Sequence, residues 1–373
     1  MAIRTITDHS ELLACRDQWN LVANDWPFSS WEWCVNWWLH LGAGMEPYVI
    51  VETDECGKWL SVTPMVRCNT LFGENKIYSM GSGDACTDYT SLIVGDDADV
   101  EQSTARFIET LTELRGNKNE RIEVVEFEGV DVSAETTQFL IEQMEQQGYN
   151  AHCLPLESSW QLELDSDWET LNARFSKKHR RKTRKAIQRL EQSNIDIQYA
   201  SRTEDFEGMW SSFSELHQQR RQMLGQAGCF ADLEFEQFLK SATMQLLERG
   251  LAEIIQISLD GQPIAATLLF HNHQTAFMYQ TGFDPAMKQL EPGYLLIVAS
   301  MLWSIESEFD TFDFLRGDEP YKARWQTTAV ELAKLRFVDT STVGSQIRDN
   351  LWVNVRNAKS KVKQVKEKLH AAR

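Results

Sequence analysis

The chain lacks the features that would place it in several specialised classes. No stretch of its 373 residues approaches the ~20 consecutive apolar residues that a membrane span needs. Met1–Arg16 lacks the charged segment and following apolar segment of a secretion signal. The seven cysteines are odd in number, scattered and never spaced as CxxC, which argues against disulfides and a structural zinc site. We therefore expect a cytoplasmic protein with reduced thiols and no metal.

Proline/glycine/serine-rich linkers and low-complexity segments are also missing, although the length favours two domains. Hydrophobic residues make up 42% of the chain and include 13 tryptophans, enough for sizeable cores. Six of these tryptophans lie near the N-terminus. We interpret them as helix core, with a carbohydrate-binding platform as the alternative. They are Trp19, Trp26, Trp31, Trp33, Trp37 and Trp38.

The net charge of −18 disfavours nucleic acid as a bulk partner, but the positive charge is concentrated in two places. Residues 174–189 hold nine Lys or Arg and no carboxylate, and residues 356–373 hold seven against the single Glu367. An acidic body with two basic islands can still bind a polyanion locally.

A faint internal repeat organises the rest of the sequence. In each half, the sequence pattern predicts antiparallel strands, a crossover helix and one further strand. In the first half the ranges are Tyr48–Glu52, Trp59–Arg67, Lys76–Met80, Val100–Arg115 and Arg121–Phe127. In the second half they are Ala252–Leu259, Pro263–Phe270, Thr275–Thr281, Pro292–Glu308 and Thr311–Leu315. Asp260-Gly261 between two of these strands is a strong hairpin signal.

The most informative segment is Phe312–Trp325, where an apolar alternation runs into glycine, two carboxylates, proline, and then Tyr, Lys, Arg and Trp. The alternation predicts a buried strand that Gly317 and Pro320 end. Strand ends that open into a charged turn are where α/β proteins place ligands. This segment is therefore our main candidate site.

The string DFLRGDEPYKARW at residues 313–325 resembles the signature of the BioF-like and CelD-like acetyltransferase domain, a branch of the GNAT superfamily related to FemAB peptidyltransferases. Three weaker stretches fit in the family's order: Pro27–Trp31, Phe175–Lys178 and Glu291–Tyr294. The resemblance implies an α+β fold with two mixed sheets in tandem GNAT-like domains. We expect an N-terminal domain at 1–155, a second domain at 156–344 and a basic C-terminal helix at 345–373.

The candidate catalytic residues lie in the main motif: Asp318, Glu319, Tyr321 and Lys322. A carboxylate could take a proton from the acceptor, and Tyr321 could protonate the leaving thiolate. Arg316 and Trp325 are expected to bind substrate, together with Asp84, Asp88 and Tyr89 of a glycine-containing loop in the first half. The alternative is that the charges of the main motif form a self-paired salt-bridge knot.

The donor site implied by the resemblance lies at Gly282, Pro292, Gly293 and Tyr294, before and at the start of an apolar helix whose N–H groups favour phosphate. The glycine-spaced loop of typical GNAT enzymes is absent, which keeps aminoacyl-tRNA open as the donor. Lys178, Arg181, Lys182 and Arg184 of the first basic segment are expected to bind phosphates; the alternative is a solvated helix face.

These observations together predict an acyltransferase that moves an acyl group from acetyl-CoA or another acyl-CoA to an amine or hydroxyl of a small-molecule or nucleotide-linked precursor of the cell envelope or an exopolysaccharide. Two alternatives remain: a FemAB-like transferase that uses aminoacyl-tRNA, and an inactive GNAT pair that serves as a binding subunit in polysaccharide synthesis.

Overall fold

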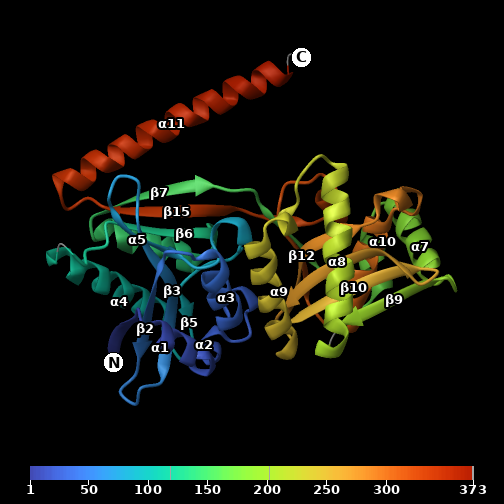
Figure 1. Ribbon diagram of the computed structural model, residues 1–373, viewed down its shortest axis with the longest axis horizontal. Coiled ribbons are helices and arrows are strands. Elements are labelled where there is room, and N and C mark those ends of the chain that lie inside the picture. Colours follow the sequence, from blue (N-terminus) through green and yellow to red (C-terminus); the bar gives the residue numbers. More distant parts are fainter. Residues whose placement is uncertain (118, 201, 372–373) are drawn as a thin grey trace.

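The computed structural model describes residues 1–117, 119–200 and 202–371, with side chains through residue 358. Two mixed sheets lie side by side, and helices cover their faces (Figure 1). The predicted α+β class with two mixed, GNAT-like sheets is therefore confirmed.

The first sheet has the strand order β1-β2-β3-β4-β6-β15-β7, with β5 paired to β3. Only β4 and β6 are parallel neighbours. Its strands are β1 (Ala2–Ile6), β2 (Glu46–Thr53), β3 (Trp59–Asn69), β4 (Asn75–Ser79), β5 (Ile93–Val94), β6 (Val124–Asp131), β7 (Tyr149–Pro155) and β15 (Leu332–Asp339). The helices of this half are α1 (His9–Ala14), α2 (Arg16–Ala23), α3 (Trp31–Leu41), α4 (Val100–Glu113) and α5 (Glu135–Gln146).

The second sheet has the order β14-β8-β13-β12-β11-β10-β9, and here only β12 and β13 are parallel. Its strands are β8 (Ser159–Glu163), β9 (Ile195–Ala200), β10 (Ala252–Leu259), β11 (Gln262–His271), β12 (Thr275–Phe283), β13 (Thr311–Arg316) and β14 (Thr328–Val330). Its helices are α6 (Trp168–Arg174), α7 (Lys177–Leu190), α8 (Thr203–Met223), α9 (Leu233–Glu248) and α10 (Pro292–Glu306).

The two sheets exchange one strand each. Strand β15 comes from the C-terminal part of the chain, yet it lies between β6 and β7 of the first sheet. Strand β8 follows β7 directly but pairs with β13 and β14 of the second sheet. The expectation that residues 156–344 form the second domain is therefore wrong for β15. Without this strand, β6 and β7 would face each other with unpaired backbone groups.

Local sequence signals account for several element boundaries. Asp260 and Gly261 both have positive φ (48° and 79°), as the tight turn between β10 and β11 requires. Helix α7 begins after Ser176, whose Oγ accepts a hydrogen bond from His179 N at 3.3 Å, so Ser176 is its N-cap. Helix α10 is buried along most of its length, which suits its almost uniformly apolar sequence.

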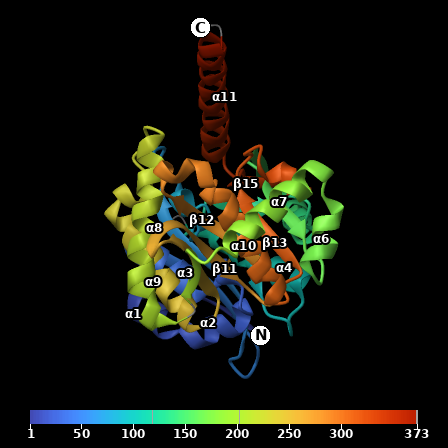
Figure 2. The same cartoon turned by 90° about the vertical axis from the view of Figure 1, so that its right-hand side faces the viewer.

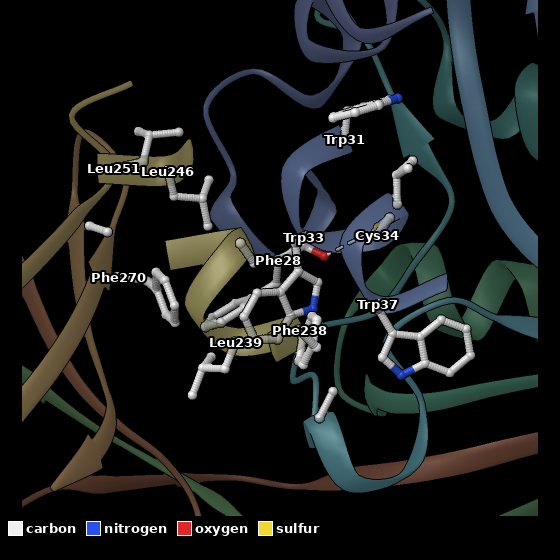
Figure 3. Close-up of a cluster of buried hydrophobic side chains, with 14 of the residues drawn as sticks. Phe28, Trp31, Trp33, Cys34, Trp37, Phe238, Leu239, Leu246, Leu251 and Phe270 are labelled. Atoms are coloured by element: carbon white, nitrogen blue, oxygen red, sulfur yellow. Dashed lines mark hydrogen bonds between the residues drawn. The ribbon is translucent and has the colours of Figure 1, made fainter. Parts of the chain in front are cut away.

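A shared aromatic core joins the halves. Trp33 of α3 is fully buried, and its ring lies 5.2 Å from Phe28, 5.0 Å from Phe238 and 5.4 Å from Phe270 (centroid distances; Figure 3). Phe238 and Phe270 belong to α9 and β11 of the second half. The N-terminal tryptophans are core, as expected: Trp19, Trp31, Trp33, Trp37 and Trp38 are buried and Trp26 packs against them.

The last helix, α11 (Val343–Ala371), starts two residues before the predicted boundary and projects from the body (Figure 2). Among the described residues, no helix combines the length and the apolar character needed to cross a membrane.

The strand exchange predicts that the first half cannot fold alone. A fragment of residues 1–158 lacks β15, whose Leu335 and Phe337 are buried in the core under β6. We expect this fragment to show no cooperative thermal transition by circular dichroism, and the full chain to melt in one transition. A cooperative melt of the fragment with dispersed amide resonances would contradict this expectation.

Candidate functional site

The second sheet opens at the end of β13. Strands β12 and β13 pair in parallel only from Thr275–Phe277 to Thr311–Asp313, although β12 continues to Phe283. The register of β13 against β8 shifts between Asp313 and Arg316, and Leu315 has a φ of +56°. This bulge turns the end of β13 away from β12. The predicted motif therefore lies where two parallel strands separate.

A buried carboxylate fixes the start of this opening. Asp313 is fully buried. One of its oxygens accepts hydrogen bonds from Ser159 Oγ (2.8 Å) and Leu315 N (2.7 Å). The other accepts from Tyr89 Oη (2.5 Å) and Gln161 Nε2 (3.0 Å). Burial raises the pKa of Asp313, and these four donors offset the cost of burying it. Tyr89 comes from the first half, so the cluster connects the two halves.

A second buried carboxylate makes a parallel connection. The Asp88 carboxylate accepts hydrogen bonds from Arg316 Nε and Arg316 N, each at 2.8 Å. Arg316 Nη2 donates a further hydrogen bond to Thr87 O at 3.0 Å. Burial raises the pKa of Asp88 to about 6, although the guanidinium opposes this shift. Three of the residues expected to bind substrate, Asp88, Tyr89 and Arg316, thus form hydrogen bonds between the two halves. The fourth, Asp84, is exposed.

Lys322 has a largely structural environment. It is 2% exposed, and its Nζ donates to Leu315 O (2.9 Å) and Arg316 O (3.1 Å) and pairs with Glu319 (3.0 Å). Gly317 has a φ of +131°, and a Cβ there would lie 3.0 Å from the ammonium. The ammonium therefore closes the bulge, and the self-paired arrangement considered for this motif holds for Lys322 and Glu319, whereas the Arg316 guanidinium pairs with Asp88 of the first half.

The other residues of the motif differ in exposure. Asp318 and Glu319 are exposed; Asp318 accepts from Ser158 N and Trp160 Nε1, both at 3.3 Å. Tyr321 lies edge-on to Phe314, and burial raises the pKa of its phenol to about 12. Trp325 is only 1% exposed and stacks on Tyr294 at 5.3 Å. Trp325, which we expected to bind substrate, has its indole in the core between α7 and α10.

Arg220 of α8 was not anticipated. Its Nη1 donates to Thr281 Oγ1 (2.7 Å) and Thr281 O (3.3 Å), and its guanidinium lies 4.8 Å from the centre of the Phe283 ring. Tyr321 and Glu319 are among its electrostatic neighbours. Helix α8 passes so close to β12 that a Cβ on Gly282 would lie 2.3 Å from His217 N, which explains this glycine. The only signal in the sequence was the Arg220-Arg221 pair in the last turn of this helix.

Helix α7 presents a basic surface to solvent. Lys178, Arg181, Arg184 and Lys185 are exposed, and no acidic side chain in the described part of the chain pairs with them. Lys182 differs: it pairs with Glu291 at 2.8 Å and lies 3.9 Å from the centre of the Tyr294 ring. The basic surface therefore adjoins the start of α10.

The start of α10 offers few backbone donors. Pro292 has no N–H, while Tyr294 N and Leu295 N both donate to Glu291 O. Gly293 N–H is thus the donor left to an outside acceptor in this first turn. Two side-chain atoms nearby, His179 Nε2 and Tyr294 Oη, are buried without a hydrogen-bond partner. Such atoms are uncommon in folded proteins and are often satisfied by an absent ligand or water.

The loop before β5 fills the corresponding opening of the first sheet. Tyr89 N donates to Gly129 O of β6 at 2.7 Å, and Ala85 O accepts from Tyr279 Oη of β12 at 2.9 Å. A cavity of about 880 Å³ lies elsewhere, between the β3–β4 turn and the segment before β6. None of the predicted site residues lines it. No cluster of metal-binding side chains occurs among the described residues.

The Arg316–Asp88 contact predicts a pH-dependent effect on stability. Replacing Arg316 by Met leaves Asp88 buried without its cation, which should cost about 3 kcal/mol in the free energy of unfolding near neutral pH. The loss should shrink as the pH falls toward 6 and be smallest below it, because the Asp88 carboxyl is then protonated in the folded state with and without Arg316, whose guanidinium lowers its pKa. Urea unfolding at several pH values measures this. The double variant Asp88→Asn/Arg316→Met should recover part of the loss, and an equal loss at every pH would show that the charge of Asp88 is not the cause.

Comparison with known proteins identifies the fold. Residues 177–323 match the model of an acetyltransferase (GNAT) domain. The crystal structure of FemX is similar, with a TM-score of 0.65 and 12% identity over 91% of this chain and 97% of that one. A conserved protein of unknown function from Bacteroides thetaiotaomicron has a TM-score of 0.57 at 12% identity, over 91% of this chain and 100% of that one.

A third similar structure is the C-terminal domain of a putative lysylphosphatidylglycerol synthetase from Agrobacterium fabrum, with a TM-score of 0.53 at 11% identity, over 92% of this chain and 97% of that one. No curated protein matches the sequence. The matched family model contains α7, α10 and the opening between β12 and β13, all described above. Residues 177–323 thus match an acetyltransferase (GNAT) domain, and this match supports an acyltransferase.

Proposed function

We propose that the protein transfers an acyl group from acyl-CoA to an amine or hydroxyl of a nucleotide-linked or other small precursor of the cell envelope or an exopolysaccharide. The observation that carries this proposal is the unpaired basic surface of α7, which adjoins the start of α10 and the opening between β12 and β13. The GNAT fold generally uses acyl-CoA, and the proposed reaction takes place in the cytoplasm.

The phosphates of the donor are proposed to lie between α7 and α10. Lys178 and Lys185 are about 10 Å apart along the helix axis, enough to span more than one phosphate. Unpaired cations on one short helix repel one another, so a bound polyanion would relieve that repulsion. Gly293 N–H, Tyr294 Oη and His179 Nε2 could complete the site, because each is a polar group without a partner in this region.

The acyl group is then proposed to lie in the opening, close to Glu319, Tyr321 and Arg220. The acceptor nitrogen or oxygen attacks the thioester carbonyl, and Glu319 takes the proton that the acceptor loses. The C–S bond breaks, and the neutral phenol of Tyr321 can donate its proton to the departing thiolate. Arg220 supplies positive charge for the developing oxyanion.

Not every predicted catalytic residue fits a direct role. The Lys322 ammonium donates to two backbone carbonyls and pairs with Glu319. These contacts support a role for Lys322 in positioning Glu319. Asp318 bonds to Ser158 N and Trp160 Nε1, which makes it a weaker candidate for the base than Glu319. The exposed Asp84 of the first-half loop remains a candidate for binding the acceptor.

A second candidate is an aminoacyl-tRNA donor. Two observations favour it: the start of α10 offers only Gly293 N–H to a pyrophosphate, and Arg220 already bonds the Thr281 carbonyl on the strand that a pantetheine arm would follow. The basic surface of α7 is also long enough for an RNA backbone. Binding measurements can separate the two donors.

The first test concerns the donor. Replacing Lys178 and Arg181 by Gln should weaken acetyl-CoA binding about tenfold or more and reduce its salt dependence, measured by calorimetry. Lys58→Gln/Lys240→Gln removes the same charge from exposed residues elsewhere and should leave binding unchanged. If the wild-type protein binds tRNA but not acetyl-CoA, and the α7 variant loses that binding, the second candidate is correct. Unchanged binding of both ligands would refute a donor role for α7.

The second test concerns the chemistry. Glu319→Gln should lower kcat by about 100-fold, the typical effect of losing a general base, while the melting temperature changes little because this side chain is exposed. Lys322→Met should instead lower both kcat and the melting temperature, since its buried ammonium holds the bulge. Activity is measured as the release of CoA. Full activity of the folded Glu319→Gln protein would exclude Glu319 as the base.

A further inference from the structure

Helix α11 has its apolar side turned away from the protein. Its inward side is polar. Ser345 is buried, Arg348 Nε lies 3.7 Å from Glu74, and Asp349 accepts from Asn150 Nδ2 at 2.6 Å and pairs with His152 at 2.8 Å. The only large aromatic ring on this side, Trp352, stacks against the Arg336 guanidinium at 4.6 Å.

The outward side carries a stripe of aliphatic residues four positions apart. Their exposures are 70% for Val343, 63% for Ile347, 45% for Leu351 and 40% for Val355. A surface helix normally buries such a stripe in the core, and here the two sides are reversed. Beyond these contacts the helix projects from the body (Figure 2).

A second exposed apolar feature lies beside the base of α11. The turn between β3 and β4 presents Leu71, which is fully exposed, and Phe72, which is 40% exposed. Glu74 closes this turn by accepting from Thr70 Oγ1 at 2.9 Å, and the same residue contacts Arg348 of α11. The turn and the helix are therefore neighbours on one end of the first half.

The charge of this end differs from that of the body. The α11 segment to the C-terminus contains eight Lys or Arg against Asp349 and Glu367, whereas the whole chain has a net charge of −18. Within the described side chains, Asp349 is already paired with His152. The apolar stripe, the basic segment and the apolar turn are together the features expected of a surface that binds the interface of an anionic bilayer.

We propose that α11 and the β3–β4 turn dock the protein on an anionic lipid surface, with Val343, Ile347, Leu351 and Val355 entering the interface and Leu71 inserting beside them. A second copy of the chain fits less well, because pairing two α11 helices would bring two strongly basic segments together. The acidic body would be repelled by the same lipids, which would orient α11 toward the surface. The inference does not depend on the proposed reaction.

Vesicle flotation with the full-length protein tests this proposal. Wild-type protein should float with phosphatidylcholine vesicles that contain about 30% phosphatidylglycerol and remain unbound with pure phosphatidylcholine. Binding to the anionic vesicles should fall in about 0.5 M NaCl, where charge attraction is screened. Ile347→Asp/Leu351→Asp should reduce binding about tenfold or more, and Leu71→Asp should reduce it less.

Leu21→Asp is the matched control. Leu21 is 80% exposed on α2, away from this surface, and its replacement should leave flotation unchanged. All these positions are exposed, so the variants should retain the wild-type melting temperature. Equal flotation of the wild type and the Ile347→Asp/Leu351→Asp variant would overturn the proposal. A wild-type dimer that the same variant converts to monomer, with no vesicle binding by either, would assign the stripe to a second copy instead.

Discussion

Two buried carboxylates, Asp313 and Asp88, hold the opening of the second sheet in register with the first half. Asp313 accepts hydrogen bonds from β8, β13 and the loop of Tyr89. Asp88 accepts hydrogen bonds from both the side chain and the backbone N–H of Arg316. Each is costly to bury unless its partners are in place. The site can therefore form only when both halves are folded and docked.

The strand exchange and the shared aromatic core also join the two halves. Strand β8 leaves the first half to pair with β13, and β15 returns to lie between β6 and β7. Trp33 packs across the halves against Phe238 and Phe270. Because neither sheet is complete without the other half, the two GNAT-like units behave as one body. That arrangement places the candidate base Glu319 and the acceptor-side Asp84 on a junction whose geometry the core fixes.

Local patterns predicted local structure well. Asp260-Gly261 marked a hairpin, and the Phe312/Phe314 alternation marked β13 and its end at Gly317. The strand exchange could not be predicted, because strand pairing between distant segments leaves no local signal. The same alternation places Asp313 on the face opposite Phe312 and Phe314, where the Tyr89 loop covers it. The burial of Trp325 against α7 and α10 and the approach of Arg220 to β12 likewise depend on neighbours far away in the sequence.

The central claim is that the donor lies along α7 and the start of α10, with its acyl group in the opening between β12 and β13. A crystal structure of the protein with bound acetyl-CoA tests it most directly. The account predicts the phosphates beside Lys178 and Arg181 and the thioester carbonyl close to Glu319, Tyr321 and Arg220. Density for the cofactor in the 880 Å³ cavity of the first half, with α7 left bare, would contradict it.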